Sequence, residues 1–234
     1  MKLIGLLGGL GWESTSLYYR MLNELTRKEL GGDHAARILL HSVNNGAIRE
    51  AGSKGDSSGV VSILCEAGRS LKAGGADFLV LATNSMHRYA EQIEEAAGIE
   101  LLHISDVTSA QVRQAGHRVV GLLGTRATME SDFYSRHLGA SSGAKVICPG
   151  PRDRIEVDRI IFDELDRGIM RNGSREFTAR LIDDLCRKGA EAIVLGCSEL
   201  TTIISPAPGA VQYYDTTRLH AQAAVHRALE VSYA

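Results

Sequence analysis

The feature that most constrains the fold is an internal repeat. Residues 75–85 (GADFLVLATNS) return 114 positions later as residues 189–199 (GAEAIVLGCSE). Each stretch is an apolar run that follows a glycine and precedes small polar residues, a pattern typical of a buried parallel strand and the turn after it. The pair predicts two similar halves, each with a polar triplet at the carboxyl end of a strand.

The repeat extends to other parts of the chain. Residues 4–8 (IGLLG) resemble residues 120–124 (VGLLG) at an offset of 116, and the Glu-Ser pair at 13–14 recurs at 130–131 at an offset of 117. A shorter match joins residues 106–108 (DVT) to 215–217 (DTT) at an offset of 109. Offsets that drift in this way are expected of a tandem duplication followed by changes in loop length.

Predicted strands and helices alternate along the chain, which favours parallel sheets joined by right-handed crossovers. Strands are expected at residues 3–7, 37–41, 78–81, 101–104, 119–123, 145–148 and 192–195. Helices are expected at residues 14–30, 60–73, 88–97, 131–138, 152–167, 174–188 and 217–231.

These patterns predict an α/β protein of two similar doubly wound parallel-sheet domains related by a pseudo-twofold axis. The active site should lie between the two domains, because ligands bind beyond the carboxyl ends of such strands. The first half is expected to comprise residues 1–100 and 210–234, and the second half residues 101–209. The chain should cross between halves near residues 98–102 and return near 208–212.

Composition excludes several classes of function. Of 234 residues, 44% are hydrophobic and 5% aromatic, and the net charge is −2. The chain therefore lacks the charge expected of a nucleic-acid or membrane surface, and no apolar run approaches the roughly 18 residues of a membrane span. The start, MKLIGLLGG, is typical of a first strand rather than of a secretory signal.

The four cysteines indicate a reducing compartment, hence a cytoplasmic protein, because they are scattered and form no Cys-x-x-Cys pair. Cys65 and Cys186 fall in helical patterns, where a cysteine usually serves as a small buried hydrophobe. Cys148 precedes a proline in a turn-like stretch. Cys197 differs because it ends a strand and opens a loop, so it is the candidate for chemistry.

Residues 8–14 (GGLGWES) approximate the glycine-rich loop of a dinucleotide site. The third glycine of that motif is missing, and no acidic residue follows the next strand to bind a ribose, so a dinucleotide cofactor is not expected. Two other interpretations stay open. The glycines could form a tight strand-to-helix turn, or they could let a small carboxylate approach backbone amides.

Metal and serine-hydrolase chemistry have weak support. The histidines are scattered without a His-Glu-x-x-His motif, so no metal site is predicted. His87, four residues after Thr83, is expected to buttress the following helix rather than to act chemically. A Ser-His-Asp triad stays open, although no Gly-x-Ser-x-Gly elbow is present.

The polar residues at the two strand ends match the groups of an amino acid. If a helix or turn begins at Cys197, its amides would lower the pKa of the thiol towards neutral, as a base requires. Thr83 can only donate a hydrogen bond or relay a proton through water. Asn84, Ser85 and Ser198 offer donors to a carboxylate, and Glu199 offers a negative charge to an ammonium group.

At these residues the chain resembles the aspartate/glutamate racemase superfamily over nearly its whole length. The matching stretches are GLLGG at 5–9, TNSMH at 83–87, LLGT at 122–125 and GCSE at 196–199. The resemblance implies deprotonation next to a carboxylate without pyridoxal phosphate or another cofactor, by one residue from each half, and a homodimer. It adds Leu10 and Thr125 to the expected substrate-binding residues.

The chain departs from the family pattern at Thr83, where most members have a cysteine. The Thr and Cys combination, with WEST at 12–15, is most similar to the L-aspartate/glutamate-specific racemases. The basic side chains expected to bind the distal carboxylate have no clean counterpart, since Arg49 lies off register. The hypothesis is that the Cys197 thiolate takes the α-proton on one face, while Thr83 or its water serves the other face poorly.

Two alternatives remain open on the sequence. One is a single-cysteine decarboxylase or isomerase of small dicarboxylates, which needs only one proton donor. The other is a non-catalytic amino-acid binder, in which Thr83 marks lost activity.

Overall fold

The computed structural model describes residues 1–204 and 211–230, which fold as two compact units. The first unit comprises residues 1–103 and the chain from His220 onward, and the second unit comprises residues 104–219. Within the described residues, no helix is both long and apolar enough to cross a membrane.

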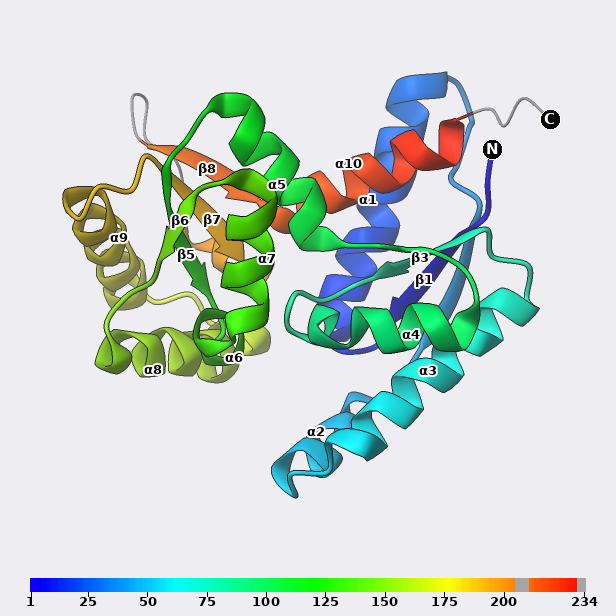
Figure 1. Ribbon diagram of the computed structural model, residues 1–234, viewed down its shortest axis with the longest axis horizontal. Helices are drawn as coiled ribbons and strands as arrows, with labels where there is room; N and C mark the ends of the chain where they lie inside the picture. The colour runs from blue at the N-terminus through cyan, green and yellow to red at the C-terminus, as the bar shows by residue number, and fades with distance from the viewer. Residues whose placement is uncertain (205–210, 231–234) are drawn as a thin grey trace. The chain divides into compact units, whose positions relative to one another are not determined.

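The first unit contains a parallel sheet with the strand order β2-β1-β3-β4, and its two central strands, β1 and β3, are labelled in Figure 1. The strands are β1 (Ile4–Gly8), β2 (Ile38–Ser42), β3 (Phe78–Leu81) and β4 (Leu101–Leu102). All residues of β1 and β3 are buried, as expected of central strands covered on both faces. The strand that follows β1 in the chain, β2, lies on one side of the central pair, and the strand that follows β3, β4, lies on the other side. The β1–β3 pair is therefore the topological switch point of the sheet.

Two groups of helices cover the two faces of this sheet. One face packs on α1 (Trp12–Leu30) and α10 (Thr216–Leu229) through Ile4, Leu6 and Phe78. The other face packs, through Leu7 and Leu79, on α2 (Asn45–Ser53), α3 (Ser57–Ala73) and α4 (Ala90–Ala97). Neighbouring residues of one strand contact opposite helix layers because side chains alternate across a sheet. A 3₁₀ turn, η1 (Ser85–Tyr89), joins β3 to α4.

The second unit repeats this arrangement with the strand order β6-β5-β7-β8, again parallel. Its strands are β5 (Val119–Gly124), β6 (Lys145–Ile147), β7 (Ala192–Gly196) and β8 (Gln212–Asp215). The order is that of the first unit shifted by four strands, and the switch point is therefore the β5–β7 pair.

Helices also cover both faces of the second sheet. The helices α5 (Ile104–Ala115) and α7 (Asp132–Ser142) pack on one face through Val120, Leu122 and Val194. The opposite face packs on α8 (Pro151–Arg159) and α9 (Asn172–Arg187) through Leu123 and Ile193. A short helix, α6 (Arg126–Glu130), follows β5, and a 3₁₀ turn, η4 (Glu199–Thr202), follows β7.

The helix predicted at residues 152–167 is divided into three pieces. After α8 the chain forms a π-helical turn, η2 (Ile160–Glu164), and then a 3₁₀ turn, η3 (Leu165–Arg167). The carboxylate of buried Glu164 accepts hydrogen bonds from Ser174 at 2.5 Å and from Arg159 at 2.9 Å. These bonds satisfy a buried charge where the helical pattern changes, and they favour the departure from regular α-helix.

The predicted fold class is confirmed, since both units are doubly wound α/β layers. The return to the first unit comes at His220, inside α10, rather than near residues 208–212, because β8 completes the second sheet. Residues 208–210 of that predicted crossing lie outside the described residues. The sequence patterns did not predict three of the helices in the described residues, α2, α5 and α6.

Candidate functional site

The sequence-predicted residues of the first unit collect at its switch point. Leu10 follows β1, while Thr83, Asn84 and Ser85 follow β3, the strand beside β1. Parallel neighbours end at the same edge of a sheet, so both loops lie at the carboxyl edge, where ligands bind in open α/β sheets.

The glycine loop after β1 is a tight turn into α1. Gly9 has φ +84°, and a Cβ there would lie 2.1 Å from the backbone oxygen of Val43. Its amide donates to the Thr15 hydroxyl at 2.8 Å. Because this amide already has a partner inside the turn, it is not available to a phosphate or a carboxylate.

The Thr83 strand end is held by a buried histidine. His87 is 2% exposed, and its Nδ1 atom lies 2.7 Å from the backbone oxygen of Thr83. This contact is the buttressing role expected of His87. The Thr83 side chain is half-buried, and its hydroxyl forms no hydrogen bond within the described part of the chain.

A second histidine extends this support to the other helix layer. His220, from α10, lies 2.8 Å from both the Tyr18 hydroxyl and the Leu102 backbone oxygen. The rings of His87 and His220 meet edge to face at a centroid distance of 5.5 Å. Burial lowers the pKa of His220 to about 4 and depresses that of His87 strongly, so both rings are neutral.

The predicted residues of the second unit lie at its own switch point. Thr125 follows β5, and Cys197 follows β7, the strand beside it. The Thr125 side chain caps α6 by accepting from the Thr128 amide at 3.3 Å, and it also contacts the Thr128 hydroxyl at 3.0 Å. Its hydroxyl therefore already has partners inside its own loop.

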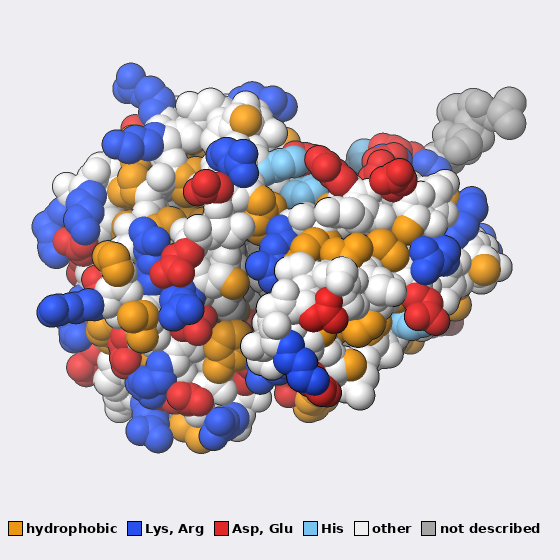
Figure 2. Space-filling model, turned by 60° about the horizontal axis from the view of Figure 1, so that its bottom comes forward, with side chains coloured by type: hydrophobic (Ala, Val, Ile, Leu, Met, Phe, Trp, Pro, Cys, Tyr) orange, Lys and Arg blue, Asp and Glu red, His pale blue; other side chains and the backbone are white. Residues whose placement is uncertain are grey.

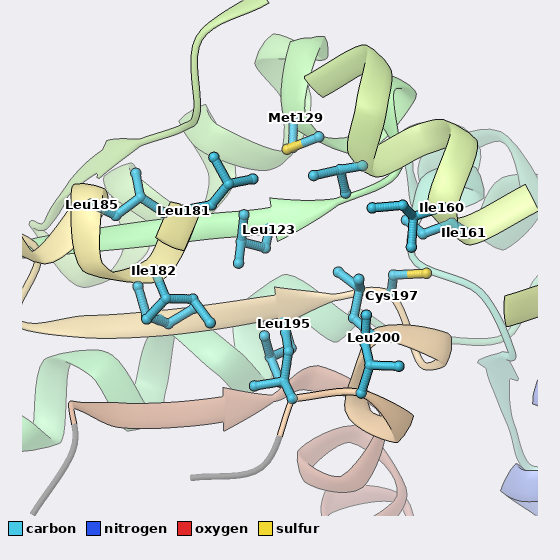
Figure 3. Packing of buried hydrophobic residues seen from close by; sticks show 14 of the residues in the cluster. Leu123, Met129, Ile160, Ile161, Leu181, Ile182, Leu185, Leu195, Cys197 and Leu200 are labelled. Atoms are coloured by element: carbon cyan, nitrogen blue, oxygen red, sulfur yellow. The ribbon is translucent and has the colours of Figure 1, made fainter. Parts of the chain in front are cut away.

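Cys197 lies at the end of an apolar cluster and carries a carboxylate contact. Ile160 and Ile161 lie on one side of it and Leu200 on the other, beyond the tip of β7 (Figure 3). Its Sγ atom lies 2.8 Å from Oε2 of Glu199, and the Ser198 hydroxyl lies 3.0 Å from the same oxygen. Glu199 is thus engaged with the thiol, although the sequence assigned it to an ammonium group.

The expectation of a lowered thiol pKa is wrong for this structure. Burial raises the pKa of Cys197 well above its ordinary value, and the negative charge of Glu199 raises it further. Backbone amides of Glu199 and Leu200 act in the opposite direction, as a turn that starts at this point should. Desolvation and the carboxylate outweigh them, so the resting sulfur carries its proton.

The other three cysteines have structural surroundings. Cys65 is buried in α3, and Cys186 packs in part against the core of the second unit. Cys148 donates to the Met129 backbone oxygen at 3.6 Å, and burial raises the pKa of its thiol. None of the three sits at a strand end of either switch point.

The charged residues give few leads to a ligand. Arg49 is exposed on α2, the helix that begins three residues after the end of β2. In the second unit, Nε2 of His137 lies 2.5 Å from Oδ1 of Asp106. These two side chains offer two ligand atoms, whereas a structural zinc site needs four. Lys, Arg, Asp and Glu side chains are interspersed on the face shown in Figure 2.

Comparisons with known proteins identify the family of this chain. The family described as Asp/Glu/Hydantoin racemase matches residues 7–224. The chain belongs to this family. It is 23% identical over 229 residues to the broad specificity amino-acid racemase RacX of Bacillus subtilis (strain 168), covering 95% of this chain and 96% of that protein.

Two solved structures share the fold of the racemase-family chain over 98% of its length. A putative Asp/Glu racemase from Yersinia pestis is 44% identical with a TM-score of 0.93. An aspartate racemase homologue from Pyrococcus horikoshii OT3 is 29% identical with a TM-score of 0.86. Both of those chains are covered completely.

The sequence did not predict the residues that support the candidate site. Tyr18 and His220 are 202 positions apart, and no local pattern joins them. The short Cys-Ser-Glu stretch did contain a signal, because Glu199 lies only two positions from Cys197 and shares its turn.

Proposed function

We propose that this protein is a cofactor-independent amino-acid racemase acting on aspartate or glutamate. The observation that carries the proposal is the equivalent placement of Thr83 and Cys197: Cys197 directly follows β7, Thr83 follows β3 after one residue, and each strand belongs to its sheet's switch point. Membership of the racemase family and the likeness to RacX support the reaction type.

In the proposed reaction, Cys197 exchanges a proton with one face of the substrate Cα, and Thr83 serves the opposite face. Thr83 acts through its hydroxyl or through water held by it, because an aliphatic hydroxyl does not ionise usefully near neutral pH. A positioned acid or base contributes about 10²–10⁴-fold to a proton transfer. An asymmetric pair of this kind should therefore be slower than a pair of thiols.

The substrate assignment rests on the polar groups around the two loops. Asn84 and Ser85 offer hydrogen-bond donors to an α-carboxylate, whereas the Ser198 hydroxyl already donates to Glu199, and Leu10 and Thr125 border the same edges. Arg49 is exposed on α2 and is not assigned to the distal carboxylate of the substrate. Activity on aspartate and glutamate should therefore be compared with activity on neutral amino acids. A protein that accepts both classes would resemble RacX, a broad specificity amino-acid racemase.

Exchange of the α-proton with solvent tests the function. The full-length protein is incubated in D₂O with L- and D-amino acids, and NMR follows loss of the α-proton. Exchange without carbon dioxide release is expected for at least one amino acid. Cys197→Ala should abolish it, while Cys148→Ala, a matched change at another thiol of the second unit, should not.

Other outcomes identify the alternatives. Release of carbon dioxide from a small dicarboxylate would identify a decarboxylase. Binding of an amino acid without any α-exchange, retained in Cys197→Ala, would identify a non-catalytic binder. We further propose a homodimer that works in the cytoplasm, and sedimentation of the purified protein tests the dimer.

A further inference from the structure

The contact between Cys197 and Glu199 is short and fixed. The Sγ atom lies 2.8 Å from Oε2, and the thiol is the donor to this oxygen. Ser198 donates to the same oxygen at 3.0 Å, so the carboxylate is held from two sides. The sulfur is buried, with 6% of the residue exposed, while Glu199 is half-buried.

This geometry directs the thiol proton towards Glu199. A thiol carries one proton, and here that proton is donated to Glu199. The lone pairs of the sulfur then point elsewhere and are available to accept a second proton. A general base in hydrogen-bond reach activates a nucleophilic or acid–base side chain of this kind, and here the group in reach is a carboxylate.

We propose that Glu199 is the terminal proton acceptor behind Cys197, so that the thiol relays a proton between the substrate Cα and this carboxylate. The inference rests on the proposed racemase function and names the base that this function needs. Cys197 then passes protons while it stays protonated, and it need not rest as a thiolate.

The step balances without another reactant. The Cα–H bond breaks and its proton forms a new S–H bond, while its electron pair stays on Cα. At the same time the original S–H bond breaks and its proton forms an O–H bond on Glu199. The negative charge passes from the carboxylate to the substrate carbanion, and the reverse sequence returns a proton to Cα.

The relay gives neighbouring residues different duties. Ser198 is a positioning residue, because it holds Oε2 where the thiol can reach it. Glu199 is engaged with the thiol and needs its charge for the relay, so the ammonium group of the substrate requires another partner.

Three variants separate the relay from a structural role. Glu199→Gln keeps an oxygen acceptor but removes the base, Glu199→Asp keeps the base on a shorter side chain, and Ser198→Ala releases Oε2. Each full-length variant is checked for folding by circular dichroism and then assayed for α-proton exchange in D₂O. We expect Glu199→Gln to lose about 10²–10⁴-fold in exchange rate, with part restored in Glu199→Asp.

Two measurements on the Cys197 thiol do not depend on the turnover of a substrate. The absorbance of thiolate at 240 nm, taken as parent minus Cys197→Ser at pH 7, should show no thiolate at Cys197. Alkylation by iodoacetamide, corrected with the same variant for the other cysteines, should be slow in the parent and no slower in Glu199→Gln, because removal of the negative charge favours the thiolate.

The outcomes are distinguishable. Exchange in Glu199→Gln within about threefold of the parent, or a thiolate at Cys197 at pH 7, would overturn the relay and leave the racemase proposal intact. A rise in KM with kcat retained would assign Glu199 to the substrate ammonium instead and would also overturn it. If the parent exchanged no α-proton with any amino acid, the proposed function would fail and the relay with it.

Discussion

The backbone oxygen of Thr83 accepts a hydrogen bond from Nδ1 of His87 at 2.7 Å. The donor ring is buried at the start of the segment that follows β3, so the strand end that carries Thr83 is tied to its own downstream turn. Since Nδ1 donates, Nε2 carries a lone pair, and this buried atom has no hydrogen-bond partner in the part of the chain that the structure describes.

Removing this ring should destabilise the first unit. His87→Ala loses the bond to Thr83 and leaves a cavity, which together cost about 2–4 kcal/mol of unfolding free energy. Urea unfolding at pH 7.5 measures the change. His34→Ala, at an exposed histidine of the same unit, should stay within about 0.5 kcal/mol of the parent. Equal losses in both variants would contradict the role of His87.

The buried histidines should also make stability depend on pH. The pKa of His220 is about 4 in the folded state, against about 6.5 in an unfolded chain. Above pH 6.5 both states are neutral at this site and stability is complete. As the pH falls towards 4, His220 is protonated in the unfolded state but not in the folded state, so the free energy of unfolding decreases.

For His220 alone the loss between pH 7.5 and pH 5.0 should be about 2 kcal/mol. Urea unfolding of the parent at the two pH values gives the total. In His220→Gln, which cannot titrate, the difference between the two pH values should shrink by about that amount. An unchanged difference would show that His220 does not cause the pH dependence.

The repeated apolar segments predicted the architecture well because such segments indicate strands that are buried on both faces. The run at β3 (Phe78–Leu81) was placed correctly from residues 78–81, since a strand covered on both faces must be apolar throughout. The helices α2 (NGAIREAGS) and α5 (ISDVTSAQVRQA) were missed because their sequences hold glycine in the first case and β-branched residues, serine and aspartate in the second, all of which have low intrinsic helix propensity. Their place depends on packing against distant strands, which no local pattern contains.

The position of Cys197 after a strand was predicted from the sequence, but the electrostatic surroundings of its thiol were not. The location of Cys197 follows from the strand that precedes it, whereas its pKa depends on where the Glu199 side chain points. A turn start favours a thiolate, and the sequence shows that much. Whether burial and a neighbouring carboxylate outweigh it depends on distances of a few ångströms, which need the folded chain.

Gly9 should be far less tolerant of a side chain than Gly31, although both have positive φ. Gly31→Ala costs only the backbone strain of its conformation (φ 75°, ψ −179°), about 1–3 kcal/mol, because nothing lies within 4 Å of the added Cβ. Gly9→Ala adds a collision with the Val43 backbone at 2.1 Å, so it should lose at least about 2 kcal/mol more. Thermal unfolding of the two variants compares them, and similar melting temperatures would argue against the tight packing of this turn.

Thr83→Cys should raise the rate of racemisation. The variant replaces a hydroxyl that cannot ionise near neutral pH with a thiol that can donate and accept a proton. Because L- and D-enantiomers have equal free energies in an achiral solvent, kcat/KM must rise by the same factor in both directions. We expect a gain of about 10-fold or more, within the range that a positioned acid or base supplies.

Chiral chromatography of reactions started from each enantiomer measures this gain, with Thr83→Ser as the matched control that keeps the hydroxyl. The serine variant should stay near the parent rate, and Thr83→Ala should fall below it if the hydroxyl or its water carries the proton. Turnover of the D-enantiomer that is the same in Thr83→Cys and the parent would mean that Thr83 does not limit the reaction. The second face of the substrate would then be served by another group.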